Sequence, residues 1–170
     1  MSIKKTGDWA KAEAFFKDLE NNGKVAASKL LKQIGLKGEQ IAVEHLQKQD
    51  LGWKELSARY KMQKMKATAN YSEKILIRTS TLFQSITTFT ANKKAYVGVK
   101  KGVKYQNSKG EVEVANIMAI HEFGSDKKGI PARPLFKPTR EELKAFCTNN
   151  PKLANAFLSE IGNLEIDNKL

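Results

Sequence analysis

The sequence predicts an α+β domain in which an antiparallel β-sheet of about four strands packs against a long N-terminal helix and C-terminal helices. Three observations lead to this fold class. Apolar residues keep helical spacing through the first 50 residues, short segments rich in β-branched residues follow, and helix start signals return after residue 138. Separate runs of strands and helices along a chain are typical of α+β domains.

The first 50 residues predict two helices. Asp8 can cap the first, residues 8–20, whose apolar face consists of Trp9, Ala12, Phe16 and Leu19. Asn21-Asn22-Gly23 is expected to end this helix, because glycine suits the left-handed position after a helix. A second helix is expected over 24–49, in which Gly35 and Gly38 mark either a kink or a close approach of another backbone. We interpret His45 in this helix as a packing residue rather than a ligand.

The middle of the chain predicts two hairpins. Residues 50–72 are rich in lysine and show no clean periodicity. The first hairpin joins a strand that starts at Phe83 or Gln84 and ends at Thr90 to a strand over 95–100. The second joins 103–105 to 111–114, with Gly110 in its turn.

Three helix signals follow the strands. A short helix is expected over 115–123, stopped by Gly124. Thr139 and Glu142 form a capping box that opens a helix through about Phe146, and Asn150-Pro151 starts a last helix. We therefore divide the chain into an N-terminal helical extension (1–23), an α+β domain (24–148) and a C-terminal helix with a frayed tail (149–170).

The composition predicts a soluble, basic protein made in a reducing cytoplasm. The chain has 170 residues, a net charge of +12, a single cysteine and no apolar run behind its first lysines. No stretch approaches the ~20 apolar residues that span a bilayer, so no membrane contact is expected. Residues 51–110 carry 13 Lys and Arg against 2 Asp and Glu. This local excess favours a polyanion or an acidic protein face as partner, although a basic surface also serves solubility alone.

The sequence gives little sign of catalysis. A zinc protease needs His-Glu-x-x-His on one helix, and here Phe123-Gly124-Ser125 follows His121-Glu122. Two histidines are too few for a three-histidine metal site, and no glycine-rich phosphate loop occurs. A pair of Cys147 with His121 is the one nucleophile arrangement left open, but a cysteine on a helix is usually a small core residue. We therefore predict that the protein is not an enzyme and holds no cofactor or metal.

The segment over residues 53–66 suits contact with a polyanion. It interleaves Trp53 and Tyr60 with basic residues, a composition that neutralises a nucleic-acid backbone with occasional base stacking. It lacks the motifs of proteins that read bases. The candidates for contact with a partner protein or with DNA in a channel are Lys54, Arg59, Lys61, Lys64 and Lys66.

Four short motifs, in this order, resemble a known family. They are GWKELS, ILIRTSTLFQSI, IHEFG and IPARPLF, which begin at residues 52, 75, 120 and 130. The pattern is similar to that of the Mu-like phage virion morphogenesis proteins and the related tail-completion (head–tail joining, tail terminator) proteins. The matching residues are Trp53, Leu56, Leu76, Thr79, Leu82, Ser85, Ile86, Ile120, His121, Phe123, Gly124, Ile130, Pro131, Ala132, Arg133 and Pro134.

The chain departs from the family's pattern at two places. Ser80-Thr81 stands where the family has a glycine before the leucine of the second motif, so we expect the turn into the strand to be made differently. Leu135-Phe136 replaces a phenylalanine directly after the second proline. The resemblance covers about residues 25–145.

The resemblance implies a structural protein of virion assembly, made in the host cytoplasm and located at the head–tail junction or the upper end of the tail. The expected partners are further copies of itself in a ring, such as a hexamer, around the DNA channel, together with connector or head-completion proteins and tail-tube proteins. Proximity to DNA without sequence preference is also expected. The alternative function is a small cytoplasmic DNA-binding protein without sequence preference.

The proline-flanked motif is expected to shape an assembly surface. Pro131 and Pro134 restrict the residues before them to extended backbone, which predicts a stiff strap. Arg133 can clamp Glu122 or a carboxylate on a neighbouring subunit, or it can tie the strap to its own domain. His121 and Phe123 are expected to hold the short helix against the sheet. The predicted assembly-surface residues are Trp53, Leu56, His121, Phe123, Gly124, Pro131, Arg133 and Pro134.

Overall fold

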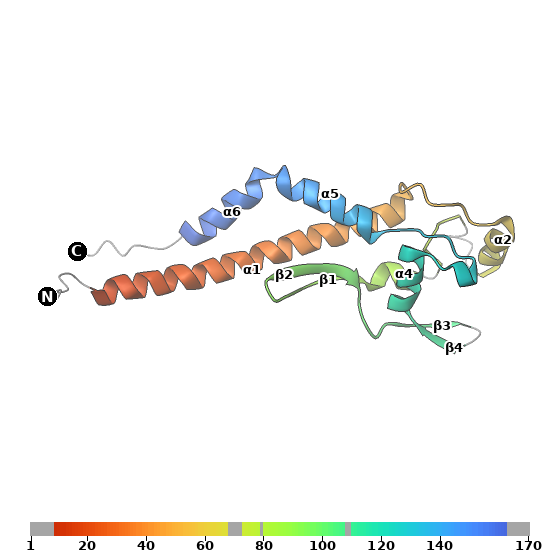
Figure 1. The fold of residues 1–170 in the computed structure, drawn as a ribbon, viewed down its shortest axis with the longest axis horizontal. Helices are drawn as coiled ribbons and strands as arrows, with labels where there is room; N and C mark the ends of the chain where they lie inside the picture. Colours follow the sequence, from red (N-terminus) through yellow and green to blue (C-terminus); the bar gives the residue numbers. More distant parts are fainter. Residues whose placement is uncertain (1–8, 68–72, 79, 108–109, 163–170) are drawn as a thin grey trace.

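One long helix forms the spine of an elongated molecule (Figure 1). A computed structural model describes residues 9–67, 73–78, 80–107 and 110–162. Helix α1, Trp9–Lys48, has 40 residues, which at 1.5 Å per residue makes it about 60 Å long. The described ends of the chain therefore lie far from the elements that gather at the C-terminal end of α1.

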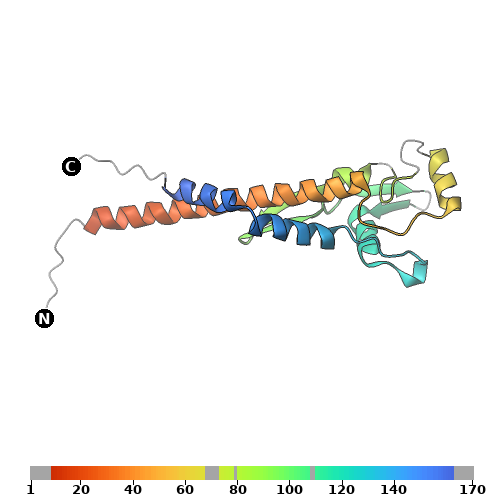
Figure 2. The same ribbon diagram turned by 90° about the horizontal axis from the view of Figure 1, so that it is seen from above.

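Helix α1 carries two helices on one side and a β-hairpin on the other. Helices α5 (Phe136–Thr148) and α6 (Pro151–Gly162) run back along it, and strands β1 (Ile86–Ala91) and β2 (Lys94–Val99) contact it too (Figures 1 and 2). The other described elements lie near its C-terminal end: α2 (Ala58–Ala67), α3 (Thr81–Ser85), β3 (Lys104–Asn107), β4 (Gly110–Glu113), α4 (Val114–Phe123) and the 3-10 helix η2 (Asp126–Lys128).

The expected helix end at Asn21-Asn22-Gly23 is wrong, because α1 continues through these residues. A glycine inside a helix costs about 1 kcal/mol relative to alanine, a penalty that neighbouring turns can offset since helix formation is cooperative. Packing of α6 against α1 adds contacts that no local pattern reveals. The predicted helical extension and the predicted second helix are therefore parts of one helix.

Gly35 and Gly38 let α1 approach its neighbours closely, so of the two alternatives, a kink or a close approach, the structure shows a close approach. A Cβ atom on Gly35 would overlap the Thr88 hydroxyl of β1 and come within 3.3 Å of its Cβ. A Cβ atom on Gly38 would lie 2.9 Å from the side chains of both Leu143 and Val97. These positions hold glycine because α1 packs directly on the hairpin and on α5.

The α+β fold class is confirmed, and both predicted hairpins are present. The first strand, however, begins at Ile86 rather than at Phe83 or Gln84, because Thr81–Ser85 forms helix α3. β1 pairs with β2 in antiparallel register from Ile86 opposite Val99 to Ala91 opposite Lys94, and β3 pairs with β4. Asn92 and Lys93 between β1 and β2 both have positive φ, as a two-residue hairpin turn requires. The four strands form two two-stranded sheets rather than one sheet, because the chain turns at Gly102 (φ 83°) after β2.

The later helices follow their predicted starts and stops with one exception. Gly124 (φ 77°) ends α4, and the Asn150 side chain accepts a hydrogen bond from the Lys152 N–H (3.2 Å) at the start of α6, as expected. Helix α5, however, begins at Phe136 rather than after Thr139. Thr139 lies inside the helix, where its hydroxyl donates to the Leu135 carbonyl (2.7 Å).

The lysine-rich segment contains a helix that periodicity did not predict. Ser57 accepts a hydrogen bond from the Tyr60 N–H (3.3 Å) at the start of α2, a capping role that serine commonly fills. Residues 68–72 of this segment lie outside the described residues, as do Thr79 of the second motif and the tail over 163–170.

The core lies where the C-terminal half of α1 meets the smaller elements. Its buried cluster consists of Ala42, Leu46, Trp53, Ile77, Ile86, Met118 and Leu135. Within the described ranges, no helix is both long and apolar enough to cross a membrane. The core joins residues from three of the four sequence motifs, and the candidate site is built around it.

Candidate functional site

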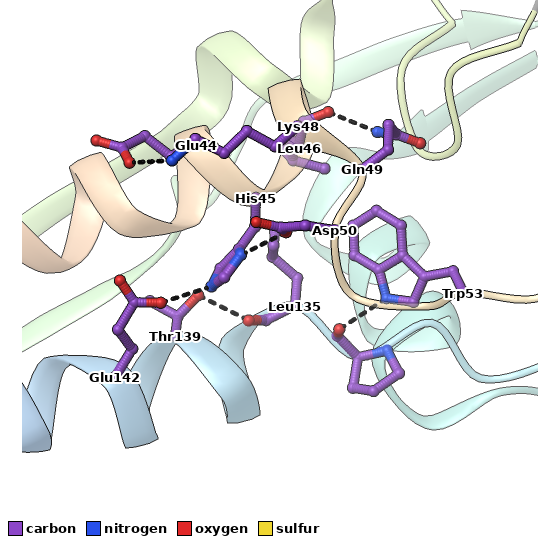
Figure 3. A network of polar contacts seen from close by, with 11 residues as sticks. Glu44, His45, Leu46, Lys48, Gln49, Asp50, Trp53, Leu135, Thr139 and Glu142 are labelled. Carbon is purple, nitrogen blue, oxygen red and sulfur yellow. Dashed lines mark hydrogen bonds and ion pairs between the residues drawn. The ribbon is translucent and has the colours of Figure 1, made fainter.

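The first and last motifs are bound to each other at one corner of the molecule. The buried Trp53 donates its indole N–H to the Pro134 carbonyl (2.9 Å; Figure 3). Arg133 donates from Nε and Nη2 to the Lys54 carbonyl, at 3.2 and 3.1 Å. Of the alternatives for Arg133, the structure therefore shows a tie within its own domain, and the expected clamp on Glu122 is wrong.

Glu122 instead caps helix α5. Its carboxylate accepts hydrogen bonds from the backbone N–H groups of Leu135 (2.7 Å), Phe136 (3.0 Å) and Lys137 (3.0 Å). The first N–H groups of a helix have no partner within the helix, and a negative charge there is stabilising. The acidic residue of the IHEFG motif thus fixes where α5 begins and how the proline-flanked segment enters it.

His45 fastens the C-terminal end of α1 to its surroundings, in agreement with its predicted packing role. The buried ring places Nδ1 2.7 Å from an Asp50 carboxylate oxygen and Nε2 3.3 Å from a Glu142 carboxylate oxygen (Figure 3). The hydrogen bond with His45 lowers the pKa of Asp50 below its ordinary value. Glu142, predicted to cap α5, thus contacts α1 instead.

A cavity of about 620 Å³ opens beside this corner. All four motif segments contribute to its wall, as do α2, β3, α4 and the segment over 73–78. The lining residues are Lys54, Glu55, Leu56, Ser57, Tyr60, Lys64, Lys74, Leu76, Ile77, Arg78, Thr81, Leu82, Tyr105, Val114, Ile117, His121, Gly129, Ile130, Pro131 and Arg133. The wall is thus largely apolar, and its charged groups are mostly cationic.

Burial changes the ionisation of three groups in this wall. Burial, together with the charge of Arg78, lowers the pKa of Lys64 to about 8. Burial is also the main cause of the lowered pKa of His121, with a smaller effect of the Arg133 charge. The pKa of the Arg133 guanidinium is lowered by burial as well. Positive charge is therefore held in surroundings that solvate it poorly.

The basic residues singled out in the sequence do not form one exposed stripe. Lys54, Arg59 and Lys66 are exposed. Lys61 forms ion pairs with Glu73 (3.0 Å) and Glu55 (3.5 Å), which offset its charge. Lys64 is buried and donates to the Lys74 carbonyl, so it faces the cavity rather than a surface.

One predicted assembly-surface residue, Phe123, and the turn at Ser80 both differ from expectation. Phe123 does not hold α4 against a sheet, since 83% of it is exposed. The buried face of α4 carries Val114 and Met118, four residues apart, and Phe123 falls outside it. Ser80 adopts the left-handed backbone conformation (φ 60°, ψ −10°), which glycine adopts most readily. Ser80 therefore adopts the backbone conformation that a glycine would adopt in this turn, and the turn is not made differently as expected.

The remaining motif residues meet at the same place. Leu56 and Pro131 line the cavity. A Cβ atom on Gly124 would lie only 3.0 Å from the Ala132 backbone nitrogen, so the chain passes close to itself there. The cysteine considered as a nucleophile lies in the last turn of α5, next to α6, whereas His121 lies on α4 at the opposite end of α5 (Figure 1). Burial raises the pKa of the Cys147 thiol, which disfavours the reactive thiolate.

Sequence reasoning missed Glu122 as a cap and the cavity itself. The capped N–H groups begin 13 residues after Glu122, beyond the three-residue spacing of a capping box. The cavity combines residues from six separate segments, and no spacing rule covers such a set. The one available signal was the density of basic residues around 54–78.

Comparison with known proteins places the chain in a family without assigning it an activity. No family model matches the chain, and no solved structure matches it. It is 34% identical over 118 residues to the uncharacterized protein MJ0331 of Methanocaldococcus jannaschii, a match that covers 68% of this chain and 74% of that protein. The chain therefore belongs to the same family as MJ0331.

Proposed function

We propose that this protein is a structural subunit of a tailed-phage particle, which acts in a ring at the head–tail junction or at the upper end of the tail. The resemblance of the four motifs suggests this role. The contacts between the motifs support it, because Trp53, Glu122 and Arg133 each make hydrogen bonds that brace backbone segments. Such residues give a surface one fixed shape.

One observation carries the proposal: the N-terminal half of α1 leaves large apolar side chains exposed. Phe16 is 65% exposed, and its neighbour Phe15 contacts it edge to face with ring centroids 5.8 Å apart. Trp9 and Val25 are about half exposed on the same helix. Apolar groups gathered on one segment of a surface are typical of a protein–protein interface. We infer that this half of α1 packs against another subunit.

The shape of the protomer suits a ring. Further exposed apolar side chains lie on other elements, among them Phe89 stacked on Tyr96 in the β1–β2 hairpin (ring centroids 4.9 Å apart) and Met62 and Met65 on α2. When one face of a subunit binds a different face of the next, the contact repeats and closes into a ring if the rotation allows. The elongated protomer provides two such separate faces, the N-terminal half of α1 and the opposite end, which carries α2 (Figure 1).

The test is to change the α1 surface without unfolding the protomer. Phe16→Asp places a charge at the proposed interface, and Lys17→Asp, at an exposed neighbouring position, is the matched control. The proposal expects purified Phe16→Asp to be monomeric by light scattering and a phage carrying it to accumulate filled heads beside separate tails in electron micrographs. Normal infectious particles from the Phe16→Asp phage would refute the proposal.

A further inference from the structure

We propose that the cavity beside Arg133 is a binding site for a carboxylate carried on an apolar body. This inference goes beyond the assembly role and does not depend on it. It rests on the composition of the cavity wall and on two polar groups within it that have unused hydrogen-bonding capacity.

The charge of the cavity wall favours an anionic ligand. Five of the residues that line it are cationic (Lys54, Lys64, Lys74, Arg78 and Arg133), against one acidic residue, Glu55. Glu55 is within ion-pair distance of Lys61 outside the cavity wall (3.5 Å), so part of its charge is already shared. The residues that line the cavity therefore carry more positive than negative charge.

Arg133 is the group in greatest need of a counterion. It is only 7% exposed, and Nε and Nη2 both donate to the same uncharged acceptor, the Lys54 carbonyl. Within the described ranges Arg133 forms no ion pair with a carboxylate, and its guanidinium donates through Nε and Nη2 and not through Nη1. A buried charge is normally paired, since removing it from water is costly. A bound carboxylate supplies the missing pair, and its two oxygens match the free edge of a guanidinium.

His121 provides a second polar group at the same place. Its Nδ1 is buried and has no hydrogen-bond partner in the described part of the chain. The backbone N–H of Arg133 donates to the His121 carbonyl (2.6 Å), which keeps the two residues adjacent. The lowered pKa of His121 keeps its ring neutral near pH 7, and a neutral ring can donate a hydrogen bond to an anion or accept one from a hydroxyl.

The rest of the wall favours an apolar body on that carboxylate. Leu56, Ile77, Val114, Ile117 and Ile130 are among the apolar lining residues, and a volume of about 620 Å³ lies within the range of small-ligand sites. A DNA duplex does not fit into such a cavity. A phosphate group carries more charge and more bound water than a carboxylate, and mostly apolar walls would leave it poorly solvated.

The experiment measures binding of sodium octanoate to the full-length protein by isothermal titration calorimetry. We expect one octanoate per protomer. Octan-1-ol, which lacks the charge, and inorganic phosphate, which lacks the apolar body, should each bind at least tenfold more weakly. Arg133→Gln should weaken octanoate binding at least tenfold, provided that circular dichroism shows a folded variant.

A second variant keeps the proposal testable if Arg133→Gln does not fold. Arg78 lines the cavity and its side chain is exposed, so Arg78→Gln should fold and weaken octanoate binding about threefold. Lys93→Gln, an exposed position in the β1–β2 turn, is the matched control and should leave binding unchanged. Equal octanoate binding by the wild type and by Arg78→Gln would overturn the assignment of the site.

A peptide distinguishes the two sources of such a carboxylate. The probe is acetyl-Leu-Glu-Ile-Asp-amide, which has the sequence of residues 164–167 of this chain. Binding of both octanoate and the peptide supports a ligand supplied by a protein segment, and binding of octanoate alone supports a free small molecule. If neither binds the wild type, or if phosphate binds as tightly as octanoate, the proposal is wrong.

Discussion

Replacing Glu122 by glutamine keeps the size of the side chain and removes the charge that caps α5. One Glu122 oxygen accepts from Leu135 and Phe136, and the other accepts from Lys137. In glutamine one of these oxygens becomes an NH₂ group, which cannot accept a hydrogen bond. At least one backbone N–H of the first turn therefore loses its partner.

The size of the effect follows from these contacts. A hydrogen bond to a charged group contributes about 1.5–3 kcal/mol, and a neutral one about 0.5–1.5 kcal/mol. The interaction of a carboxylate with the positive N-terminal end of a helix adds about 0.3–1 kcal/mol. Because Glu122 is half-buried, water can partly replace the lost contacts. We expect Glu122→Gln to lower the free energy of unfolding by about 2 kcal/mol.

Urea denaturation followed by circular dichroism measures this change. The urea midpoint should fall with an unchanged slope, because unfolding of the variant exposes the same surface area as unfolding of the wild type. Glu141→Gln is the matched control, because Glu141 lies on the same helix, is exposed, and forms its ion pair with the exposed Arg140 (2.8 Å). Its effect should stay within about 0.5 kcal/mol. If the two variants lose the same stability, Glu122 does not cap α5.

Three further predictions concern stability. Gly35→Ala should lower the free energy of unfolding by about 2 kcal/mol, because the added methyl group overpacks the contact with β1. Gly23→Ala, where an added Cβ meets nothing within 4 Å, should raise it by about 0.5–1 kcal/mol. Urea midpoints that shift in the same direction would contradict the close approach at Gly35. Trp53→Phe keeps an aromatic ring but leaves a buried carbonyl without its donor, and thermal unfolding should show a loss of about 1–2 kcal/mol; an unchanged melting temperature would exclude this contribution. The lowered pKa of His121 means that the unfolded chain binds a proton first, so stability should fall as pH drops below about 6.5. His121→Gln should reduce this slope in urea titrations between pH 7 and 5, and an equal slope would refute the assignment.

Part of the candidate site could be predicted from the sequence because its residues carry strong local constraints. Trp53 belongs to the first motif and Arg133 and Pro134 to the last, and the structure joins these two motifs by hydrogen bonds. The partners within that set could not be predicted. Arg133 binds a backbone carbonyl and Glu122 binds backbone N–H groups, and side-chain chemistry alone does not distinguish these partners from an Arg–Glu pair.

The sequence by itself determined the fold class, both hairpins, the end of α4 at Gly124 and the start of α6 at Asn150. Each of these depends on residues within a few positions of one another, so propensity, turn chemistry and capping are sufficient. Tertiary structure decided the continuity of α1 through Gly23, the start of α5 and the separation of the strands into two sheets. Those features depend on contacts between segments far apart in the chain, such as α6 on α1 and Glu122 on α5. The free energy of such contacts exceeds local conformational preferences of about 1 kcal/mol per residue. It cannot be predicted from residues that are neighbours in the sequence.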